Sequence, residues 1–207
     1  MIAVIDYGAG NIQSVVKALH HIGCEEICVT KDKDVLRSAD AAILPGVGSF
    51  GHAMECLNSS GLTETVKEFI ASDKPFLGIC LGLQMLFEES EESPGVAGLG
   101  ILKGKIRLIP KEYGVEIKIP HIGWNSLDIK KPEGIYEGIQ DGAYVYFVHS
   151  YYLTAEDRDV VSAQTYYGVS IDASIQRGNL FATQFHPEKS GEVGIQMLRN
   201  FVSLIHS

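Results

Sequence analysis

The sequence predicts an α/β fold built around a largely parallel sheet. Up to Glu92, short apolar runs of strand length alternate with segments in which apolar residues recur at helical spacing. Strands that alternate with helices favour a parallel sheet covered by helices on both faces. After Glu92, short strand-like runs separated by turn residues indicate an antiparallel layer or a mixed continuation of the sheet.

The elements of the parallel half follow from the positions of the apolar residues. The chain opens with an apolar strand at Ile2–Ile5, and the helix after it is expected to end at Gly23, because glycine is common just past a helix C-terminus. The other elements expected before Glu92 are strands at 27–30, 41–44 and 76–79, a short helix near Val35, and helical segments that contain Met54, Leu57, Leu62, Val66 and Ile70.

The second half is expected to contribute strands and one closing helix. Strand-like runs bounded by turn residues lie at 98–110, 114–119, 122–129, 143–152, 160–166, 171–176 and 180–184. The segments 130–134 and 156–159 have the composition of exposed loops. Apolar residues at helical spacing predict an amphipathic helix over 195–205.

Length, charge and cysteine content indicate the number of domains and exclude some classes of protein. The 207 residues are expected to form one domain, 1–207, which is long enough to bury a substantial core. A net charge of −9 without a run of Lys or Arg disfavours a nucleic-acid or anionic-membrane surface. The N-terminus has no basic leader and no apolar segment approaches the roughly 18 residues of a membrane span, so a cytoplasmic protein is expected. Cys24, Cys28 and Cys56 are expected to be structural, and neither a metal nor a cofactor is expected.

The stretch around Cys80 has the pattern of a strand that turns sharply into a helix. A short buried strand ends at Ile79, Cys80 follows between Gly78 and Gly82, and helical spacing begins at Leu81. This is the sulfur counterpart of the nucleophile elbow, whose usual form is Gly-x-Ser-x-Gly. The glycines leave room for a tight turn, and a helix N-terminus favours the reactive thiolate. The alternative, a small buried thiol, does not explain the two glycines.

A base and an orienting group for such a thiol are found at His186 and Glu188. A cysteine nucleophile needs a base, and the base needs a partner that fixes its tautomer. We expect the segment 186–188 to be extended, so that both side chains project to the same side while Pro187 stiffens the backbone. The alternative is a surface histidine beside a carboxylate. His121 and His149 lie beside aromatic strands and are compatible with a structural role.

A second glycine-rich motif, Gly46-Val-Gly-Ser-Phe-Gly51, follows the third expected strand. It matches G-x-G-x-x-G, but a dinucleotide site needs this motif in the first βα turn and an acidic residue at the end of the next strand. Here the acid at the right offset, Glu68, lies in a helical pattern, which disfavours nucleotide binding. The loop can instead present backbone N–H groups to an anion.

Together these motifs resemble the class I, or triad, glutamine amidotransferases. The resemblance rests on 75–84 and on Gln184-Phe-His-Pro-Glu188. Further motifs are similar to those of the family of glutaminase subunits of imidazole glycerol phosphate synthase: Asp6-Tyr-Gly-Ala-Gly-Asn11, Pro45-Gly-Val-Gly-Ser-Phe-Gly51, Pro120-His-Ile-Gly-Trp-Asn125, Tyr146-Phe-Val-His-Ser-Tyr151 and His186-Pro-Glu-Lys-Ser190. The match runs from Met1 to the last helix, without a departure at a catalytic position.

The resemblance implies a flavodoxin-like, three-layer α/β domain that hydrolyses glutamine to glutamate and ammonia. It implies that Cys80 is the nucleophile, His186 the general acid/base and Glu188 the group that orients it. Ammonia would pass to a (β/α)8-barrel cyclase subunit, the partner that makes imidazole glycerol phosphate and an aminoimidazole carboxamide ribotide for histidine and purine synthesis.

Other residues take expected roles from the resemblance and from their positions. The oxyanion of the attacked amide would be bound by the N–H of Leu81 and by one from Val47 or Gly48. Gln84 lies one helical turn past Cys80, where it can reach the bound amino acid. The substrate would contact Gly46, Gly48, Gln84, Ser150 and Tyr151, and the cyclase would contact Asn11, Trp124, Tyr146 and Lys189. The alternative for Trp124 and Tyr146 is a place in the core.

Three other functions remain open. A degenerate domain kept only as a binding partner is disfavoured by the intact Cys80, His186 and Glu188. A stand-alone cysteine hydrolase or protease would turn over a γ-glutamyl or peptide substrate by itself. A subunit of another amidotransferase, such as that of pyridoxal phosphate or aminodeoxychorismate synthesis, is disfavoured by the motif at 120–125.

Overall fold

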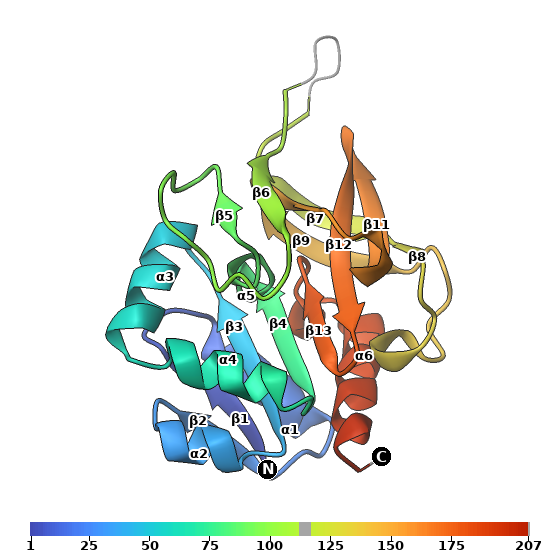
Figure 1. Ribbon diagram of the computed structural model, residues 1–207. Helices are drawn as coiled ribbons and strands as arrows, with labels where there is room; N and C mark the ends of the chain where they lie inside the picture. Colours follow the sequence, from blue (N-terminus) through green and yellow to red (C-terminus); the bar gives the residue numbers. More distant parts are fainter. Residues whose placement is uncertain (112–116, 207) are drawn as a thin grey trace.

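The computed structural model describes residues 1–111 and 117–206. Within these residues the centre is an eight-stranded sheet with the strand order β2-β1-β3-β4-β13-β12-β11-β8 (Figure 1). Strands β2, β1, β3, β4 and β13 pair in parallel, and β12, β11 and β8 continue the sheet with antiparallel pairing. The mostly parallel sheet with an antiparallel extension that the sequence predicts is confirmed.

The elements of this sheet and of its covering helices occupy the following segments. The strands are β1 (Ile2–Ile5), β2 (Ile27–Thr30), β3 (Ala41–Gly46), β4 (Phe76–Cys80), β8 (Asp128–Ile129), β11 (Val161–Tyr167), β12 (Val169–Arg177) and β13 (Leu180–Thr183). The α-helices are α1 (Ile12–His21), α2 (Lys33–Ser38), α3 (Phe50–Ser59), α4 (Thr63–Ala71), α5 (Leu81–Met85) and α6 (Gly191–Ser203). Short 3-10 helices are η1 (Gly134–Tyr136), η2 (Arg158–Val160), η3 (Pro187–Lys189) and η4 (Leu204–His206).

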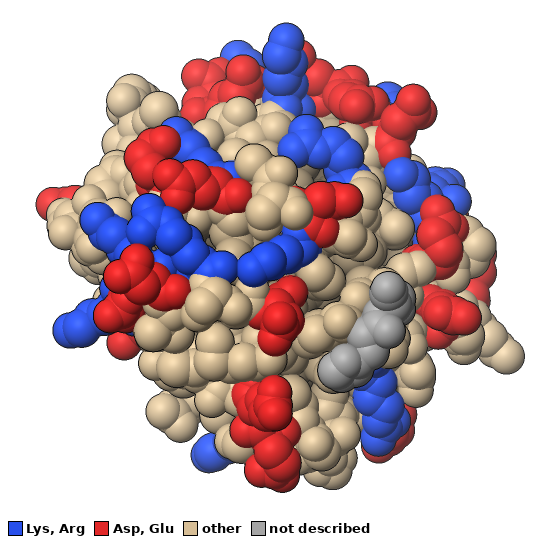
Figure 2. All heavy atoms as spheres, turned by 60° about the horizontal axis from the view of Figure 1, so that its bottom comes forward, with Lys and Arg blue, Asp and Glu red and all other residues tan. Residues whose placement is uncertain are grey.

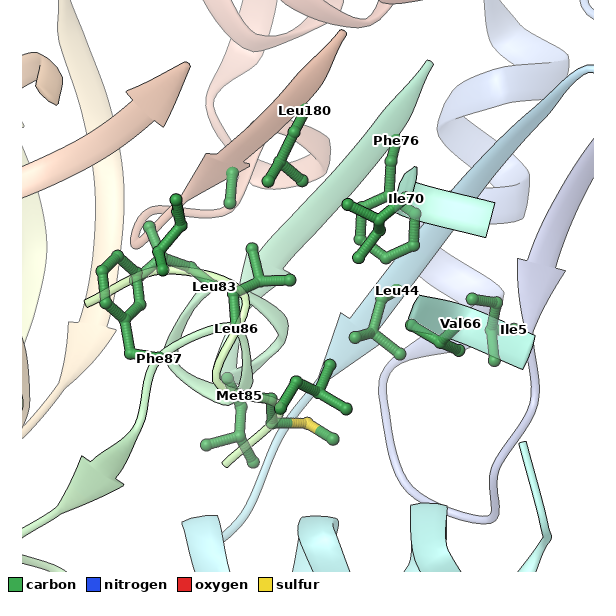
Figure 3. Close-up of a cluster of buried hydrophobic side chains, with 14 of the residues drawn as sticks. Ile5, Leu44, Val66, Ile70, Phe76, Leu83, Met85, Leu86, Phe87 and Leu180 are labelled. Atoms are coloured by element: carbon green, nitrogen blue, oxygen red, sulfur yellow. The ribbon is translucent and has the colours of Figure 1, made fainter. Parts of the chain in front are cut away.

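Helices cover both faces of the parallel strands and make three layers (Figure 1). Because side chains alternate along a strand, Ile2 and Val4 of β1 pack with α1 and α6, whereas Ala3 and Ile5 pack with α2, α3 and α4. Figure 3 shows the second of these cores, in which residues of α5 such as Leu83 and Met85 lie against the sheet. All the side chains from Leu81 to Phe87 are buried, so the segment after Cys80 is fixed by packing.

Two smaller sheets lie above the end of the central sheet at which α5 begins (Figure 1). The three-stranded sheet contains β5 (Glu89–Ser90), β6 (Gly104–Leu108) and β10 (Tyr151–Ala155), in the order β10-β6-β5. The two-stranded sheet pairs β7 (His121–Ser126) with β9 (Tyr144–His149) in antiparallel register, and we call it the β7–β9 ribbon. Both sheets therefore border the carboxyl ends of the parallel strands, where open α/β sheets bind their ligands.

Three of the expected strands differ from the structure. The run 143–152 is not one strand, because it breaks at Ser150 into β9 and β10, which pair with different partners. The run 122–129 is likewise divided into β7 and β8, and the run 98–110 becomes a strand only at Gly104. Half of the run 114–119 lies outside the described residues, and its described part, 117–119, contains no strand.

Charged side chains of both signs are mixed on the face opposite the β7–β9 ribbon. Figure 2, which turns the bottom of Figure 1 forward, shows Lys and Arg interspersed with Asp and Glu on this face. Arg37, for example, is paired with both Asp34 and Glu68. This face therefore presents no continuous basic surface of the kind that binds nucleic acid.

Candidate active site

Cys80 lies at a strained turn between the last residue of β4 and the first residue of α5. Its φ of 55° and ψ of −106° put a residue with a side chain in a conformation that normally belongs to glycine. The neighbouring glycines are needed for close packing. A Cβ added at Gly82 would lie 2.0 Å from the backbone oxygen of Leu44, and one at Gly46 would lie 2.7 Å from Cβ of Leu81. The predicted strand-to-helix turn is confirmed.

His186 and Glu188 form a hydrogen-bonded pair beside this turn. Nδ1 of His186 lies 2.8 Å from Oε1 of Glu188, and the two side chains are only 2% and 1% exposed. The expected extended backbone is wrong, because residues 187–189 form the 3-10 turn η3 with Pro187 at its first position. Proline fits there since the first residue of a helical turn needs no N–H partner. The turn, rather than strand alternation, brings Glu188 back to the imidazole.

The electrostatic surroundings of His186 favour its charged form. Burial by itself lowers the pKa of this imidazole, but hydrogen bonds to Cys80 and Glu188 and the charges of both groups outweigh burial and raise the pKa to about 9. Because Nδ1 faces Glu188, Nε2 is the ring nitrogen left for the sulfur, and in this structure it has no hydrogen-bond partner among the described residues. His186 is thus held by Glu188 through Nδ1 and is electrostatically coupled to Cys80.

A pocket of about 400 Å³ opens over Cys80. The sequence-predicted residues that line it are Val47, Gly48, Cys80, Leu81, Gln84, Ser150, Tyr151, His186 and Lys189. Gly46 does not line it, because its backbone pairs with Cys80 inside the sheet. Glu188, Asn11 and Gly46 instead line a small recess that shares Val47 and His186 with the pocket.

The loop that carries Val47 and Gly48 is anchored at one end and exposed at the other. The hydroxyl of Tyr7 donates to the backbone oxygen of Pro45 at 3.0 Å, and Gly46 is buried in β3. Val47 is 40% exposed, and Gly48 has a φ of 97°, a conformation that glycine adopts at low cost. The backbone around these two residues therefore forms the wall of the pocket.

Two glutamines are hydrogen-bonded to each other beside Cys80: Gln84, which lines the pocket, and Gln184, which is buried behind it. Gln84 donates through Nε2 to the backbone oxygen of Tyr151 at 3.1 Å and to Oε1 of Gln184 at 3.0 Å. Gln184 in turn places its Nε2 3.7 Å from the sulfur of Cys80. The expectation for Gln84 did not extend to Gln184, whose only sequence signal is an uncharged polar residue directly after an apolar strand.

His121 and His149 form a second buried pair, on the β7–β9 ribbon. Nδ1 of His121 lies 3.0 Å from Nε2 of His149, and Nδ1 of His149 lies 2.9 Å from the backbone oxygen of Tyr151. Burial lowers the pKa of His121 to about 4 and that of His149 to about 3, so both are neutral at physiological pH. His149 also lines the pocket, which sequence reasoning did not predict.

Among the residues predicted to meet a partner, Lys189 lines the pocket and Asn11 the adjoining recess, while Trp124 and Tyr146 lie on the β7–β9 ribbon. Trp124 of β7 is 54% exposed and stands opposite Tyr146 of β9, with the ring centroids 6.1 Å apart. Lys189 is exposed and Asn11 and Tyr146 are half-buried. The alternative that places Trp124 in the core is therefore wrong.

Several further features bear on the class of protein. Over residues 1–111 and 117–206, no group of three or more His, Cys, Asp or Glu is arranged to hold a metal ion. The four cysteines are free thiols. In the same part of the chain, no helix combines the length and the apolar character needed to cross a membrane.

Comparisons with known proteins agree with the site. The chain matches the family model described as "Glutamine amidotransferase class-I" over residues 3–204. It is 52% identical over 207 residues to the "Imidazole glycerol phosphate synthase subunit HisH" of Methanothermobacter thermautotrophicus, covering 100% of both chains. It is 50% identical over 198 residues to the protein of the same name from Aquifex aeolicus, covering 96% of this chain and 94% of that one.

Solved structures show the same fold at low sequence identity. A crystal structure of a glutamine amidotransferase matches with a TM-score of 0.75 and 20% identity, covering 100% of both chains. The structure of PurLQS from Thermotoga maritima matches with a TM-score of 0.72 and 20% identity, covering 98% of this chain and 97% of that chain. The resemblance inferred from the motifs is confirmed, and the chain belongs to the class I glutamine amidotransferases, among the HisH subunits of imidazole glycerol phosphate synthase.

Proposed function

We propose that residues 1–207 act as one glutamine amidotransferase domain, the glutaminase subunit of an imidazole glycerol phosphate synthase in histidine biosynthesis. One observation supports the chemistry above all others. Cys80 stands at a turn with a positive φ, beside a buried imidazole whose other nitrogen is held by Glu188. A strained turn that presents a sulfur to a charged imidazole has the geometry of an activated nucleophile.

The reaction proceeds through a thioester. The thiolate of Cys80 attacks the side-chain amide carbon of glutamine, and the carbonyl electrons move onto oxygen. When the carbonyl re-forms, the carbon–nitrogen bond breaks, and the imidazolium of His186 gives its proton to the nitrogen that leaves as ammonia. Water, deprotonated by His186, then attacks the thioester and displaces the thiolate. The sum is glutamine and water to glutamate and ammonia.

The oxyanion formed during both attacks needs hydrogen-bond donors. The N–H of Leu81 begins α5, and the Val47–Gly48 backbone forms the facing wall of the pocket, so each is proposed to donate. Removing one such donor in other enzymes costs roughly 10²–10³ in rate. The anchoring of Pro45 by Tyr7 supports this role, because a donor must be held before the charge develops.

The glutamine substrate is proposed to contact Gly48, Gln84, Ser150 and Tyr151, which line the pocket, but not Gly46, which does not. Both amide hydrogens of Gln84 are already donated, to Tyr151 and to Gln184. Its Oε1 is therefore the atom free to contact a substrate, and this atom accepts hydrogen bonds only. A glutamine ammonium or amide group fits that requirement. The backbone of Gly46, which is buried in β3, would support the loop from behind.

The partner is proposed to be a (β/α)8-barrel cyclase subunit that receives the ammonia, in the cytoplasm. The relatives are named as subunits, which implies a second chain. The exposed Trp124 packs against the half-buried Tyr146 on the β7–β9 ribbon, and Lys189 and Asn11 supply further polar groups for contact. Aromatic residues of this kind are common anchors of protein interfaces.

Glutamine turnover by the isolated chain, by its complex with a cyclase subunit, and by that complex with its ribonucleotide substrate tests the proposal. We expect turnover to rise when the cyclase and its ligand are present, with ammonia transferred to the cyclase product. Full turnover of glutamine by the isolated chain, unchanged by the cyclase, would favour a stand-alone cysteine hydrolase. Stimulation by the synthase of another pathway, but not by the cyclase, would favour another amidotransferase.

A further inference from the structure

Gln184 contacts the sulfur of Cys80 from the strand beside it. β13 and β4 are parallel neighbours in the centre of the sheet (Figure 1), and Gln184 follows β13 just as Cys80 ends β4. Its side chain is completely buried, and its Nε2 lies 3.7 Å from Sγ of Cys80. Its backbone is fixed as well, because its N–H donates to the oxygen of Ala173 at 2.8 Å. The contact therefore joins two buried segments of adjacent strands.

The amide of Gln184 can face the sulfur in one orientation only. Gln84 donates Nε2–H to Oε1 of Gln184, so this oxygen is the acceptor end and the –NH2 group points toward Cys80. Gln84 is itself held by its second donation, to the backbone oxygen of Tyr151. An amide fixed in this way offers the sulfur a donor and cannot offer it an oxygen.

The hydrogen bonds continue from Tyr151 to the β7–β9 ribbon. The oxygen of Tyr151 can only accept, so Nδ1 of His149 carries a proton and donates to it. His149 is neutral, which leaves its Nε2 as an acceptor for the Nδ1–H of His121. Tyr151 thus receives a hydrogen bond from each side, from Gln84 and from His149. The orientation of Gln184 is determined by the whole row of side chains.

A donor that points at a cysteine sulfur favours the thiolate over the thiol. A thiolate is a far better acceptor than a thiol, so the N–H stabilises the charged state and also limits the directions in which the sulfur can point. His186 follows Gln184 by two residues, its Nε2 is free of any hydrogen bond among the described residues, and Cys80 is one of the groups that raise its pKa. The sulfur of Cys80 would then lie between two groups: the amide of Gln184, which always donates, and the imidazole of His186, which exchanges protons during the reaction.

We propose that Gln184 is a positioning residue for Cys80, which fixes the direction of the sulfur and stabilises its thiolate. The inference rests on the proposed role of Cys80 as nucleophile and adds a residue to it. Gln184 does not reach the pocket wall, so it acts through Cys80 and not by contact with glutamine.

The test measures the charge state of Cys80 directly, without turnover. The rate at which iodoacetamide alkylates Cys80 follows the thiolate fraction, so its pH profile reports the thiol pKa. Cys80→Ala supplies the background from the other free cysteines. Gln184→Met keeps the shape and removes the donor, and Gln184→Glu keeps the acceptor for Gln84 but replaces the donor by a carboxyl group. Gln176→Met, on β12 and without contact to Cys80, is the matched control.

We expect the midpoint of the profile to move up by about one pH unit in Gln184→Met and by at least as much in Gln184→Glu, because a tenfold change in thiolate equilibrium is one pKa unit. Glutamine turnover should fall about tenfold in kcat with little change in KM, and Gln176→Met should leave the midpoint in place. If Gln184→Met does not fold, the pH profile of alkylation in Gln184→Glu tests the proposal. A midpoint like that of wild type in any folded Gln184 variant overturns the proposal. Glutamine turnover that survives Cys80→Ala would instead overturn the proposed function.

Discussion

The backbone N–H of His186 donates to the backbone oxygen of Tyr146, 3.0 Å away. Tyr146 lies on the β7–β9 ribbon, and its own N–H donates to Oγ of Ser190, just past η3. The ribbon that carries the exposed Trp124 is therefore hydrogen-bonded on both sides of the turn that holds His186 and Glu188. A partner bound to the ribbon would contact β9, the strand that is hydrogen-bonded to the backbone of His186. Partner binding and catalysis would therefore depend on the same strand.

Trp124→Ala should weaken binding of the cyclase without destabilising the chain. The side chain is exposed and packs mainly on Tyr146, and buried aromatic anchors at interfaces cost about 2 kcal/mol or more when truncated. Titration calorimetry should show at least a tenfold loss of affinity, with an unchanged melting temperature. Val29→Ala, an exposed apolar residue on the edge strand β2, is the control. If Trp124→Ala and Val29→Ala bind the cyclase with equal affinity, Trp124 does not belong to the interface.

Cys80→Ala and Cys80→Gly should both abolish glutamine hydrolysis, while the complex still uses added ammonia, because ammonia enters after the thioester step. The two variants should differ in stability. Glycine in a strand usually costs about 0.5–1 kcal/mol relative to alanine, but a non-glycine residue at a positive φ costs about 1–3 kcal/mol. We therefore expect Cys80→Gly to be at least as stable as Cys80→Ala in urea denaturation.

Ala182→Gly, on the neighbouring strand β13, provides the comparison for an ordinary backbone. It should lose stability relative to its alanine parent. A Cys80→Gly variant that is about 1 kcal/mol less stable than Cys80→Ala would mean that the turn stores no strain.

Gly82→Ala should destabilise the fold by more than about 3 kcal/mol, because the new Cβ would lie 2.0 Å from the backbone oxygen of Leu44 and both are held in the core. Gly51→Ala is the matched variant. Its nearest atom is the side-chain Oγ of Ser93 at 2.8 Å, which can rotate away at the expense of its hydrogen bond from the N–H of Gly51, so the expected loss is about 1 kcal/mol. Urea midpoints measure both, and similar losses would show that α5 can shift away from β3.

Much of the fold could be predicted because buried parallel strands have a simple signature. Ile2–Ile5 has the expected bounds, since a strand covered on both faces is a continuous apolar run. The edge strand Ile27–Thr30 also has the expected bounds, although it is only partly buried. The break at Ser150 could not be predicted, because β9 and β10 have similar compositions and differ only in their pairing partners. Pairing is decided by long-range contacts that a local pattern does not contain.

The candidate site also has residues that the sequence could predict and features that it could not. Cys80, His186 and Glu188 could be named because each lies in a motif whose residue types suit one chemistry. The 3-10 turn that joins His186 to Glu188 was missed, since proline is compatible with both an extended segment and a helical first turn. Gln184 was missed because its contact with Cys80 joins positions 104 residues apart and depends on the register of β13 against β4.

Glu188→Gln should move the alkaline limb of the pH profile of kcat/KM to lower pH by about one unit. The pKa of His186 is raised to about 9 by its bonds to Cys80 and Glu188 against the effect of burial, and loss of the carboxylate charge removes part of that support. The imidazolium that protonates the leaving ammonia is then lost at a lower pH. Glu192→Gln, an exposed carboxylate in the first turn of α6, is the control. An alkaline limb that stays in place would show that Glu188 only orients the ring.

The buried pair of His121 and His149 should make the fold sensitive to acid. Burial lowers the pKa of both below the value of about 6.5 that a histidine has in the unfolded chain. Between about pH 6.5 and 4, the unfolded chain therefore binds protons that the native chain excludes, and the free energy of unfolding falls as the pH falls. Each excluded proton contributes up to about 1.4 kcal/mol per pH unit, and above pH 6.5 the contribution is complete.

Replacing one member of the pair isolates this effect. His149→Gln does not titrate, so urea denaturation between pH 7 and 4.5 should show a shallower loss of stability than in wild type, even if the variant is less stable at pH 7. His20→Gln, an exposed histidine on α1, should keep the wild-type slope. If His149→Gln and wild type lose stability in parallel, the pair is not what makes the native state sensitive to acid. In that case the carboxylates elsewhere in the chain carry the pH dependence, because they are protonated in the lower part of the same range.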